Sequence, residues 1–309
     1  MEKRLKEVAC EMSFITNIQS VAKYESKILV RSWFFRIFTL LAVAFLGFFN
    51  FAMLLMEDSG GLWFEKSVAS NIPYFSLLLL NTGQAVVAVF LSSEFLKRDK
   101  KLDTSEVFYV RPLSNAEYVV GKIWGNLRVF LLLNVLILGI VMALNFMAPG
   151  IAVDWQAYFI YFFLVSLPTL IFIIGLSIFL MLLLKNQALT FILLLGYIGL
   201  TLFYIQDKFY YLFDYMAYNL PLFKSTIVGF SSPELMLNHR AIYLFAGLGF
   251  IFFTIFLFKR LPNARRSHYP WLFLSLCMFG VAGTAGFRHI RLILEEGEVR
   301  ALYTSINNK

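Results

Sequence analysis

The sequence predicts an all-α, polytopic membrane protein, and three observations lead to this fold class. Of the 309 residues, 60% are hydrophobic and only 15% are charged, and the mean hydropathy is +0.73. A soluble domain usually carries about 25% charged residues, so this chain has too much apolar surface to bury in one aqueous core. The third observation is a series of apolar runs that each reach the roughly 20 residues a helix needs to cross a bilayer.

Seven apolar runs are candidate spans, and we expect six to seven of them to cross the membrane. They are 33–56, 71–96, 127–148, 157–184, 187–206, 241–258 and 270–287. The last run contains Gly280, Gly283 and Gly286, so it fits either a packed helix or a re-entrant segment. The chain therefore divides into an N-terminus (1–32), a transmembrane domain (33–287) and a tail (288–309).

Lys and Arg residues are distributed unequally between the two sets of connections. Nineteen of the 27 lie in residues 1–36, 97–128, 185 and 259–268, and the other eight lie in 57–70, 206–240 and 288–309. The positive-inside rule then predicts a cytoplasmic N-terminus and, with seven spans, an extracytoplasmic tail. With six spans the tail lies inside. This bias also explains the net charge of +8 without a nucleic-acid partner.

The segment before the first span has a helical pattern. Apolar residues recur at roughly helical spacing, with basic residues between them. The apolar set is Ile18, Val21, Ala22, Ile28 and Leu29, and the basic set is Lys23, Lys27 and Arg31. The pattern fits an amphipathic helix that lies on the inner leaflet and turns into the first span. It fits an ordinary basic juxtamembrane flank equally well.

The long connection at 206–240 is rich in aromatic residues. They are Phe209, Tyr210, Tyr211, Phe213, Tyr215 and Tyr218. Because aromatic side chains prefer the boundary between lipid and water, we expect a short interfacial or re-entrant helix here, broken near Pro221. We favour an aromatic belt over a substrate-binding role.

The sequence lacks the motifs of common enzyme classes. The three histidines, His239, His268 and His289, stand alone, without an HExxH motif or a carboxylate cluster. No GxSxG nucleophile elbow is present. The two cysteines, Cys10 and Cys277, have no metal-binding spacing and are expected to be inert thiols. We therefore expect no catalytic residue, no metal site and no enzyme activity.

A nucleotide-binding loop is also missing. The nearest match to a Walker A motif is Gly121-Lys122, but Ala116 stands where the first glycine belongs and Ile123 replaces Ser or Thr. The chain should not hydrolyse ATP itself, and we expect no cofactor in it.

The middle of each candidate span carries no Asp, Glu, Lys or Arg. The strongest polar side chains there are Asn81, Gln84 and Asn134, which suit hydrogen bonds between helices. Ion-coupled transporters place charged or polar ligands at this depth. Secondary transport is therefore the weakest of the three functions that we consider; the other two, an ATP-driven exporter subunit and a membrane scaffold, are described below.

The polar stretch 91–126, between the second and third spans, is organised. Leu102–Val110 predicts a short amphipathic helix, and Arg111-Pro112 breaks it. Ser114 and Glu117 fit a capping box, so the next helix should start there and run into the third span. This pattern is typical of a docking element, because a disordered linker needs neither caps nor apolar faces.

The same stretch resembles the cytoplasmic loop of ABC transporter type-2 permeases. The matching residues are Ser93-Glu94, Leu102-Asp103-Thr104, Arg111-Pro112-Leu113-Ser114, Glu117 and Gly121-Lys122. Members commonly have an acidic residue that closes the second span, a short helix, an Arg-Pro corner and a Gly-Lys entry to the third span. The N-terminal helix resembles the family's connecting helix. The resemblance covers about residues 15–260, and its specific motif lies in 93–122.

The resemblance implies the membrane subunit of an ATP-driven exporter in the bacterial cytoplasmic (inner) membrane. Such a permease dimerises with a second copy or a paralogue and sits on a separate ABC ATPase subunit, which binds the ATP. Loop 97–126 would carry the coupling helix. Glu94 would end the second span at the ATPase contact, and Lys122 would anchor the next helix at lipid headgroups, with simple snorkelling as an equal alternative. The remaining coupling residues would be Leu102, Asp103, Thr104, Val107 and Phe108 in the docking helix, then Arg111, Pro112, Ser114 and Glu117 at the corner.

Two features leave an alternative open. The family usually has six spans, whereas seven are counted here. Some large bacterial relatives fuse such a membrane module to an extracytoplasmic domain resembling a zinc aminopeptidase, so this chain could be the front part of such a protein or a separate half. The alternative function is a non-transporting anchor or scaffold that holds an extracytoplasmic partner through the 288–309 tail. A capped cytoplasmic loop favours the exporter, because a scaffold does not need one.

Overall fold

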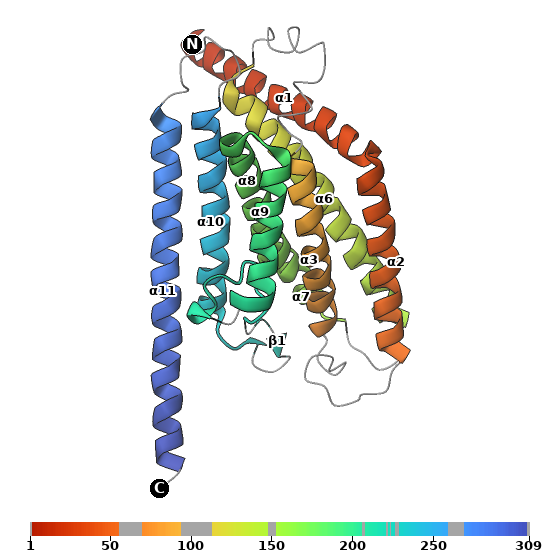
Figure 1. Cartoon of the computed structure of the whole chain (residues 1–309), viewed down its shortest axis with the longest axis vertical. Coiled ribbons are helices and arrows are strands. Elements are labelled where there is room, and N and C mark those ends of the chain that lie inside the picture. The colour runs from red at the N-terminus through yellow and green to blue at the C-terminus, as the bar shows by residue number, and fades with distance from the viewer. Residues whose placement is uncertain are drawn as a thin grey trace.

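The chain folds into a bundle of long helices with one additional helix across an end (Figure 1). The computed structural model describes residues 2–55, 70–93, 113–147, 153–205, 208–220, 222, 224–225, 229–258 and 269–307. Side chains are described within these ranges from residue 14 to residue 297, except at 54–55, 93 and 225.

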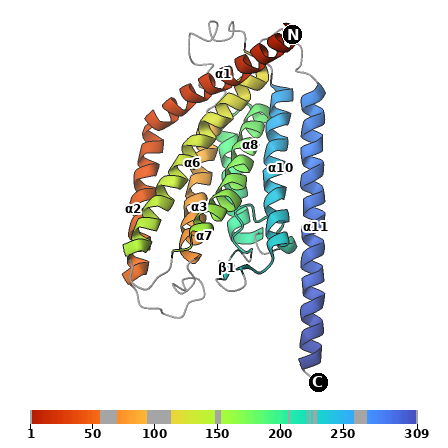
Figure 2. The ribbon, with the colours of Figure 1, turned by 180° about the vertical axis from the view of Figure 1, so that it is seen from behind.

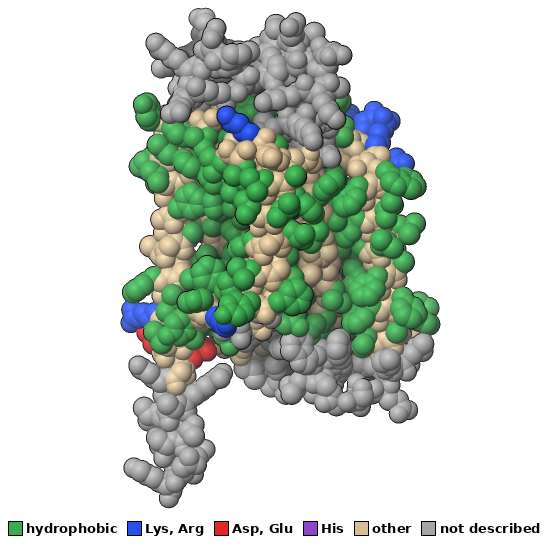
Figure 3. All heavy atoms as spheres, viewed as in Figure 1, with side chains coloured by type: hydrophobic (Ala, Val, Ile, Leu, Met, Phe, Trp, Pro, Cys, Tyr) green, Lys and Arg blue, Asp and Glu red, His purple; other side chains and the backbone are tan. Residues whose placement is uncertain are grey.

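Seven helical segments in the described residues are long and apolar enough to cross a membrane, which confirms the predicted fold class. They are α2 (Trp33–Leu55), α3 (Asn71–Ser93), α6 (Asn115–Met147), α7 (Trp155–Tyr161) continued by the π-helical turn η1 (Phe162–Ser166) and α8 (Leu167–Leu184), α9 (Gln187–Leu200) with the π-helical turn η2 (Thr201–Ile205), α10 (Pro233–Leu257) and α11 (Tyr269–Asn307). Apolar side chains cover the sides of the bundle, and Lys and Arg lie near its two ends (Figure 3). This distribution is the one expected of a protein surrounded by lipid.

The two ends of the bundle differ. Helix α1 (Glu2–Arg31) runs obliquely across one end and lies along α6 (Figures 1 and 2). We call this the α1 end. The opposite end, here the loop end, holds the described residues of 208–232 and the last part of α11, which continues beyond the other helices (Figure 1). The most enclosed spans are α3 and α7–α8, whereas α2, α9 and α11 lie at the periphery.

Local sequence signals explain most helix boundaries. Helix α8 ends at Lys185, which adopts the left-handed conformation, and Asn186 caps α9 by accepting hydrogen bonds from the amides of Ala188 and Leu189. Helix α10 begins at Pro233, inside the connection expected at 206–240. Proline favours the first helical position, and Glu234 in the first turn complements the helix dipole.

The loop end differs from the expectation of a short broken helix. Its described residues contain a single 3-10 turn, η3 (Phe209–Tyr211), and the antiparallel strands β1 (Lys224–Ser225) and β2 (Gly229–Phe230), in which Lys224 pairs with Phe230. Pro221 lies outside the described residues. The helix is absent because Phe209, Tyr210, Tyr211 and Ala217 all have positive φ, a conformation that does not propagate a right-handed helix.

Candidate functional site

The predicted coupling residues fall into two groups. Those at the start of α6, namely Ser114, Glu117 and Lys122, are described. The others lie outside the described residues: Glu94, Leu102, Asp103, Thr104, Val107, Phe108, Arg111 and Pro112. The structure therefore shows the anchor of the loop at the α1 end, where α6 begins.

The capping box predicted at this anchor is confirmed. The Glu117 amide donates a hydrogen bond to Ser114 Oγ at 3.1 Å, and the Ser114 amide donates to Glu117 Oε2 at 2.5 Å. The other carboxylate oxygen, Oε1, accepts a hydrogen bond from Asn17 Nδ2 of α1 at 2.8 Å. One carboxylate thus fixes the helix start and ties it to α1.

Lys122 does not anchor α6 at lipid headgroups, and that expectation is wrong. Its side chain is only 3% exposed and points into the protein, where Nζ lies 3.8 Å from Glu25 Oε2 of α1 and 5.1 Å from the centre of the Tyr118 ring. Glu25 is equally buried. The opposite charges compensate each other in a place where either alone would be costly.

Helix α1 approaches α6 through two glycines that lie on one face, four residues apart. A Cβ added at Gly121 would lie 2.7 Å from Val21 Cβ, and one at Gly125 would lie 2.8 Å from the Ala22 carbonyl oxygen. Both distances are shorter than side chains tolerate. The close approach lets Ser26 Oγ donate to the Gly125 carbonyl at 2.7 Å. The inner face of α1 is therefore a helix-packing surface, beyond the amphipathic pattern expected from the sequence.

The start of α6 also contacts the end of α10. Asn115 Nδ2 donates to the Phe258 carbonyl at 2.9 Å, and the Tyr118 ring stacks on the Phe258 ring with centroids 5.4 Å apart. The loop anchor thus joins three helices. We call this set the loop junction: Asn17, Glu25, Ser114, Asn115, Glu117, Tyr118, Lys122 and Phe258.

A closed ring of hydrogen bonds lies inside the bundle. Ser166 Oγ donates to Asn134, Asn134 to Gln84, Gln84 to Asn81, and Asn81 back to Ser166 Oγ. All four side chains are fully buried, and they come from α3, α6 and η1. The expectation that Asn81, Gln84 and Asn134 bond between helices is confirmed, and the ring leaves the spans α3, α6 and α7–α8 locked together.

Arg240 lies inside a span, whereas the sequence placed it in the connection just before the 241–258 run. Because α10 starts at Pro233, Arg240 lies two turns inside the helix, and it is 2% exposed. Its guanidinium donates to the carbonyls of Leu164 and Val165 at 2.6 and 3.1 Å. These carbonyls belong to the π-helical turn η1, where the regular hydrogen-bond ladder is interrupted. Arg240 therefore satisfies backbone groups that the turn leaves available.

The described residues between 208 and 225 (208–220, 222 and 224–225) form a re-entrant segment that enters the bundle from the loop end. Tyr215, Met216 and Ala217 are at most 2% exposed, and Met216 Sδ lies 3.4 Å from Thr82 Oγ1, well inside α3. The expectation of a re-entrant segment is thus met without a helix. Tyr215, expected in an interfacial belt, is buried, whereas Phe209, Tyr210 and Phe213 are exposed.

Side chains of the spans satisfy the backbone of this segment, because it has little secondary structure of its own. The hydrogen-bonded carbonyls and their donors are Tyr210 with His289, Tyr211 with His239, Leu212 with Tyr243, Tyr215 with Arg240 and Thr169, Ala217 with Tyr74, and Leu222 with Tyr161. Irregular backbone is tolerated at membrane depth only where protein supplies such partners.

His239 and His289 stand apart in the sequence, but the fold brings them together. Their ring centroids are 5.0 Å apart, and each Nε2 lies 3.0 Å from a carbonyl oxygen of η3. Since a carbonyl only accepts, both Nε2 atoms carry the proton. The two rings hold the left-handed turn at residues 209–211. No group of three or more potential metal-binding side chains occurs in the described residues.

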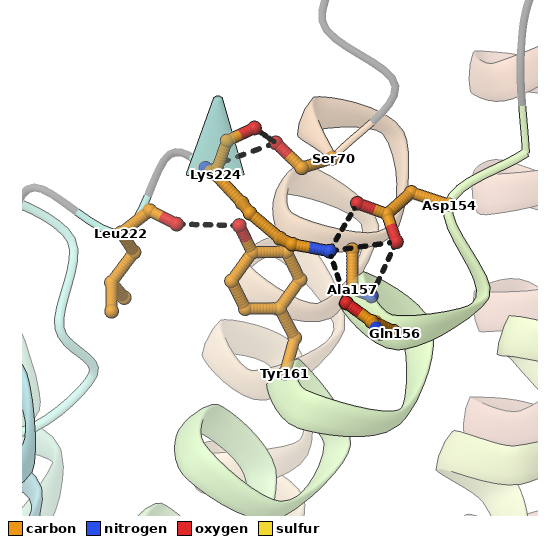
Figure 4. A network of polar contacts seen from close by, with 7 residues as sticks. All are labelled: Ser70, Asp154, Gln156, Ala157, Tyr161, Leu222 and Lys224. Atoms are coloured by element: carbon orange, nitrogen blue, oxygen red, sulfur yellow. Dashed lines mark hydrogen bonds and ion pairs between the residues drawn. The ribbon is translucent and has the colours of Figure 1, made fainter. Parts of the chain in front are cut away.

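The re-entrant segment ends in a polar tether (Figure 4). Lys224 Nζ bonds both carboxylate oxygens of Asp154, at 3.0 and 2.8 Å, and Gln156 Oε1 at 2.8 Å. Ser70 Oγ bonds the backbone carbonyl and amide of Lys224. Asp154 also caps α7 by accepting from the Ala157 amide. The tether thus connects β1 to the start of α7 and to Ser70, just before α3.

Two described aspartates of the loop end, Asp154 and Asp214, have opposite pKa shifts. Burial alone would raise the pKa of Asp154, but the hydrogen bonds from Lys224 and the Ala157 amide outweigh it and hold that pKa below its usual value. Burial raises the pKa of Asp214, although the Asn219 amide donates to its carboxylate. Asp154 is therefore the better-stabilised anion of the two.

No protein-family model matches this chain, and no curated protein matches it. The chain is a polytopic, all-helical, integral membrane protein, and its described residues contain seven candidate spans. Its described polar chemistry is gathered at the loop junction, in the buried ring and around the re-entrant segment.

Proposed function

We propose that this chain is the membrane-spanning permease subunit of an ATP-driven ABC exporter. It works as a dimer with a second copy or a paralogue, in the bacterial cytoplasmic membrane with the α1 end inside. A separate ATPase subunit binds and hydrolyses ATP, and this chain contributes no catalytic residue or cofactor. ATPase docking on the 97–126 loop moves the helices through the loop junction.

The observation that carries this proposal is the construction of the loop junction. The polar stretch between the second and third spans leads directly into the α6 capping box. Glu117 and Lys122 connect α6 to α1, and Asn115 connects it to the end of α10. A displacement of the loop would therefore reach three helices at once, as coupling to an ATPase requires.

The loop end supports the same proposal from the other side. In the described conformation the re-entrant segment fills the bundle between α3, α8 and α10. Its contacts are hydrogen bonds from side chains, each contributing only about 1 kcal/mol net because water can replace them. A permease needs a closure of this kind, which can open without unfolding a helix.

The test is purification of the tagged chain in a gentle detergent, with quantitative mass spectrometry of the proteins that accompany it. We expect an ABC ATPase in stoichiometric amount, and we expect Arg111→Glu or Pro112→Ala to reduce it severalfold while the chain still inserts. Arg291→Glu, an exposed change at the loop end, is the matched control and should retain the ATPase. Retention of the ATPase by all three variants would remove the docking role of the loop.

The alternative, a membrane anchor for an extracytoplasmic partner, has one observation in its favour. Helix α11 continues to Asn307, beyond the other helices at the loop end (Figure 1). Two contacts hold residues 288–296 of α11 against the start of α10. Arg288 lies 3.2 Å from Glu234, and Ser232 donates a hydrogen bond to Glu296 at 2.7 Å. Co-purification of an extracytoplasmic protein with no ATPase would select this function instead.

A further inference from the structure

Three basic residues form a single stripe on the outer face of α1. Lys23, Lys27 and Arg31 follow one another at intervals of four residues, and all three are exposed. The opposite face of the same helix, with Ala22, Glu25, Ser26 and Leu29, is buried. The stripe spans about 12 Å at 1.5 Å per residue, a length that can contact more than one lipid headgroup.

The charges of this stripe have no partner in the described part of the chain. None of the three forms an ion pair there, whereas Glu25, the described acidic residue among them in sequence, faces inward to Lys122. The helix thus places its anion inside the protein and its cations outside. A row of exposed cations with no ion pair among the described residues, on a helix that crosses the end of a membrane bundle, suits an anionic neighbour in the headgroup layer.

Apolar residues around the stripe identify that neighbour. Tyr24 and Val30 are 55% and 50% exposed on α1, and Trp33, at the start of α2, is 75% exposed. The stripe therefore passes directly into the lipid-facing surface of the first span. Figure 3 shows Lys and Arg side chains at the α1 end, next to the apolar belt. Basic side chains interleaved with aromatic and aliphatic ones are typical of a surface in the headgroup layer.

We propose that Lys23, Lys27 and Arg31 bind the headgroups of anionic phospholipids and hold α1 in the interface. The same helix packs on α6 through Gly121 and Gly125, so the lipid surface is connected to the loop junction through α1. A change in the density of anionic lipid then acts on the position of the junction. The binding itself does not depend on whether the chain is an exporter or an anchor.

The experiment measures lipid selectivity next to the stripe. Ser20, exposed one turn before Lys23, is replaced by cysteine in a Cys10→Ser, Cys277→Ser background and labelled with bimane. The protein is reconstituted in mixed vesicles in which either phosphatidylglycerol or phosphatidylcholine carries the bromine quencher. We expect stronger quenching by brominated phosphatidylglycerol, decreasing at high salt.

Variants separate this proposal from its alternatives. The triple change Lys23→Gln, Lys27→Gln and Arg31→Gln should lower the selectivity at least about fivefold, since each surface charge contributes about that factor. Lys23→Arg with Lys27→Arg should keep it. Lys208→Gln, Arg288→Gln and Arg291→Gln, at the loop end, form the matched control and should also keep it. Equal quenching by the two brominated lipids in the protein that keeps Lys23, Lys27 and Arg31 would overturn the proposal.

A protein partner for the stripe has a different signature. If the stripe binds an acidic protein surface, the Gln triple loses that co-purifying protein and retains the selectivity for phosphatidylglycerol, which also overturns the proposal. The charged side chains that are substituted are all exposed, so the variants should fold, and an unchanged melting temperature verifies this. Failure of the lipid test leaves the ATPase purification unaffected, because the two experiments read different contacts.

Discussion

Arg240 brings a permanent charge into a membrane-spanning helix, where its guanidinium donates hydrogen bonds to backbone carbonyls. Arg240→Met would leave the Leu164 carbonyl without this partner, at about 1–3 kcal/mol for a buried group, while Thr169 still donates to the Tyr215 carbonyl. We expect a large fall in the melting temperature in detergent. Arg240→Lys should recover only part of it, because an ammonium cannot reproduce the planar fork.

The control for Arg240 is Arg288→Met, which removes an arginine that is exposed on α11. It should change stability by less than about 0.5 kcal/mol. Equal losses in the two variants would show that charge, and not the satisfaction of buried carbonyls, determines the effect.

The ion pair between Asp154 and Lys224 should make the tether weaken at acidic pH. Its pKa is lowered in the folded protein, so its contribution to stability is complete above the unfolded-state pKa, near 4, and disappears as the pH falls through the folded-state value. Hydrogen exchange of the amides at 214–222, corrected for intrinsic rates, should be constant from pH 7 to about pH 4 and rise below it.

The Asp154→Asn variant isolates this effect, because Asn still caps α7 but cannot pair with the charge of Lys224. Asp214 acts in the opposite direction, since its raised pKa makes the folded state gain relative stability on acidification. The informative quantity is therefore the difference between the wild type and Asp154→Asn. A difference that stays constant as the pH falls below about 4 would rule out the Asp154 carboxylate as the cause.

At the scale of elements, two glycines of α6 provide a matched pair of substitutions, because one lies against α1 and the other does not. A Cβ at Gly125 would lie 2.7 Å from Glu25 Cβ, whereas one at Gly139, in the same helix, meets nothing within 4 Å. Gly125→Ala should push α1 from α6 and destabilise by about 1–3 kcal/mol. Gly139→Ala should stabilise by up to about 1 kcal/mol through helix propensity. Thermal unfolding measures both, and shifts of the same sign would contradict close packing of α1 on α6.

The buried ring gives a second prediction for the elements. Ser166→Ala removes two of the four hydrogen bonds and leaves Asn134 Oδ1 and the Asn81 amide without that partner. Interhelical hydrogen bonds in membranes contribute about 0.6 kcal/mol on average and up to about 1.7 kcal/mol. We expect a loss at the upper end of this range, and a double-mutant cycle with Gln84→Leu should show strong coupling. Additive losses would mean that the four side chains do not act as a ring.

Sequence patterns predicted the elements well where one local signal determined them. Length and hydropathy determined the seven candidate spans, and Ser114 with Glu117 determined the start of α6. The patterns failed for Lys122, because its burial depends on Glu25, nearly a hundred residues earlier. They failed for Arg240 and Tyr215 because a non-helical segment enters the bundle. Pro233 followed by Glu234 was the signal that could have placed Arg240 within a helix.

For the whole molecule, the two ends have different construction. At the α1 end, glycine contacts and a capped helix start form a junction of regular helices. At the loop end, strained backbone is held by side-chain donors. A junction transmits displacement, whereas a segment held by replaceable hydrogen bonds can be released. This asymmetry is the arrangement expected if energy enters at one end and access changes at the other.

That argument requires the α1 end to be cytoplasmic, which predicts the labelling of single cysteines. In a Cys10→Ser, Cys277→Ser background, Ser20→Cys lies on exposed α1 and Lys208→Cys lies at the exposed loop end, with five candidate spans between them. A membrane-impermeant maleimide should label Lys208→Cys in intact cells and Ser20→Cys only after permeabilisation. The reverse pattern would place the 97–126 loop outside, beyond the reach of any cytoplasmic ATPase. Labelling of both from outside would contradict an odd number of spans between them.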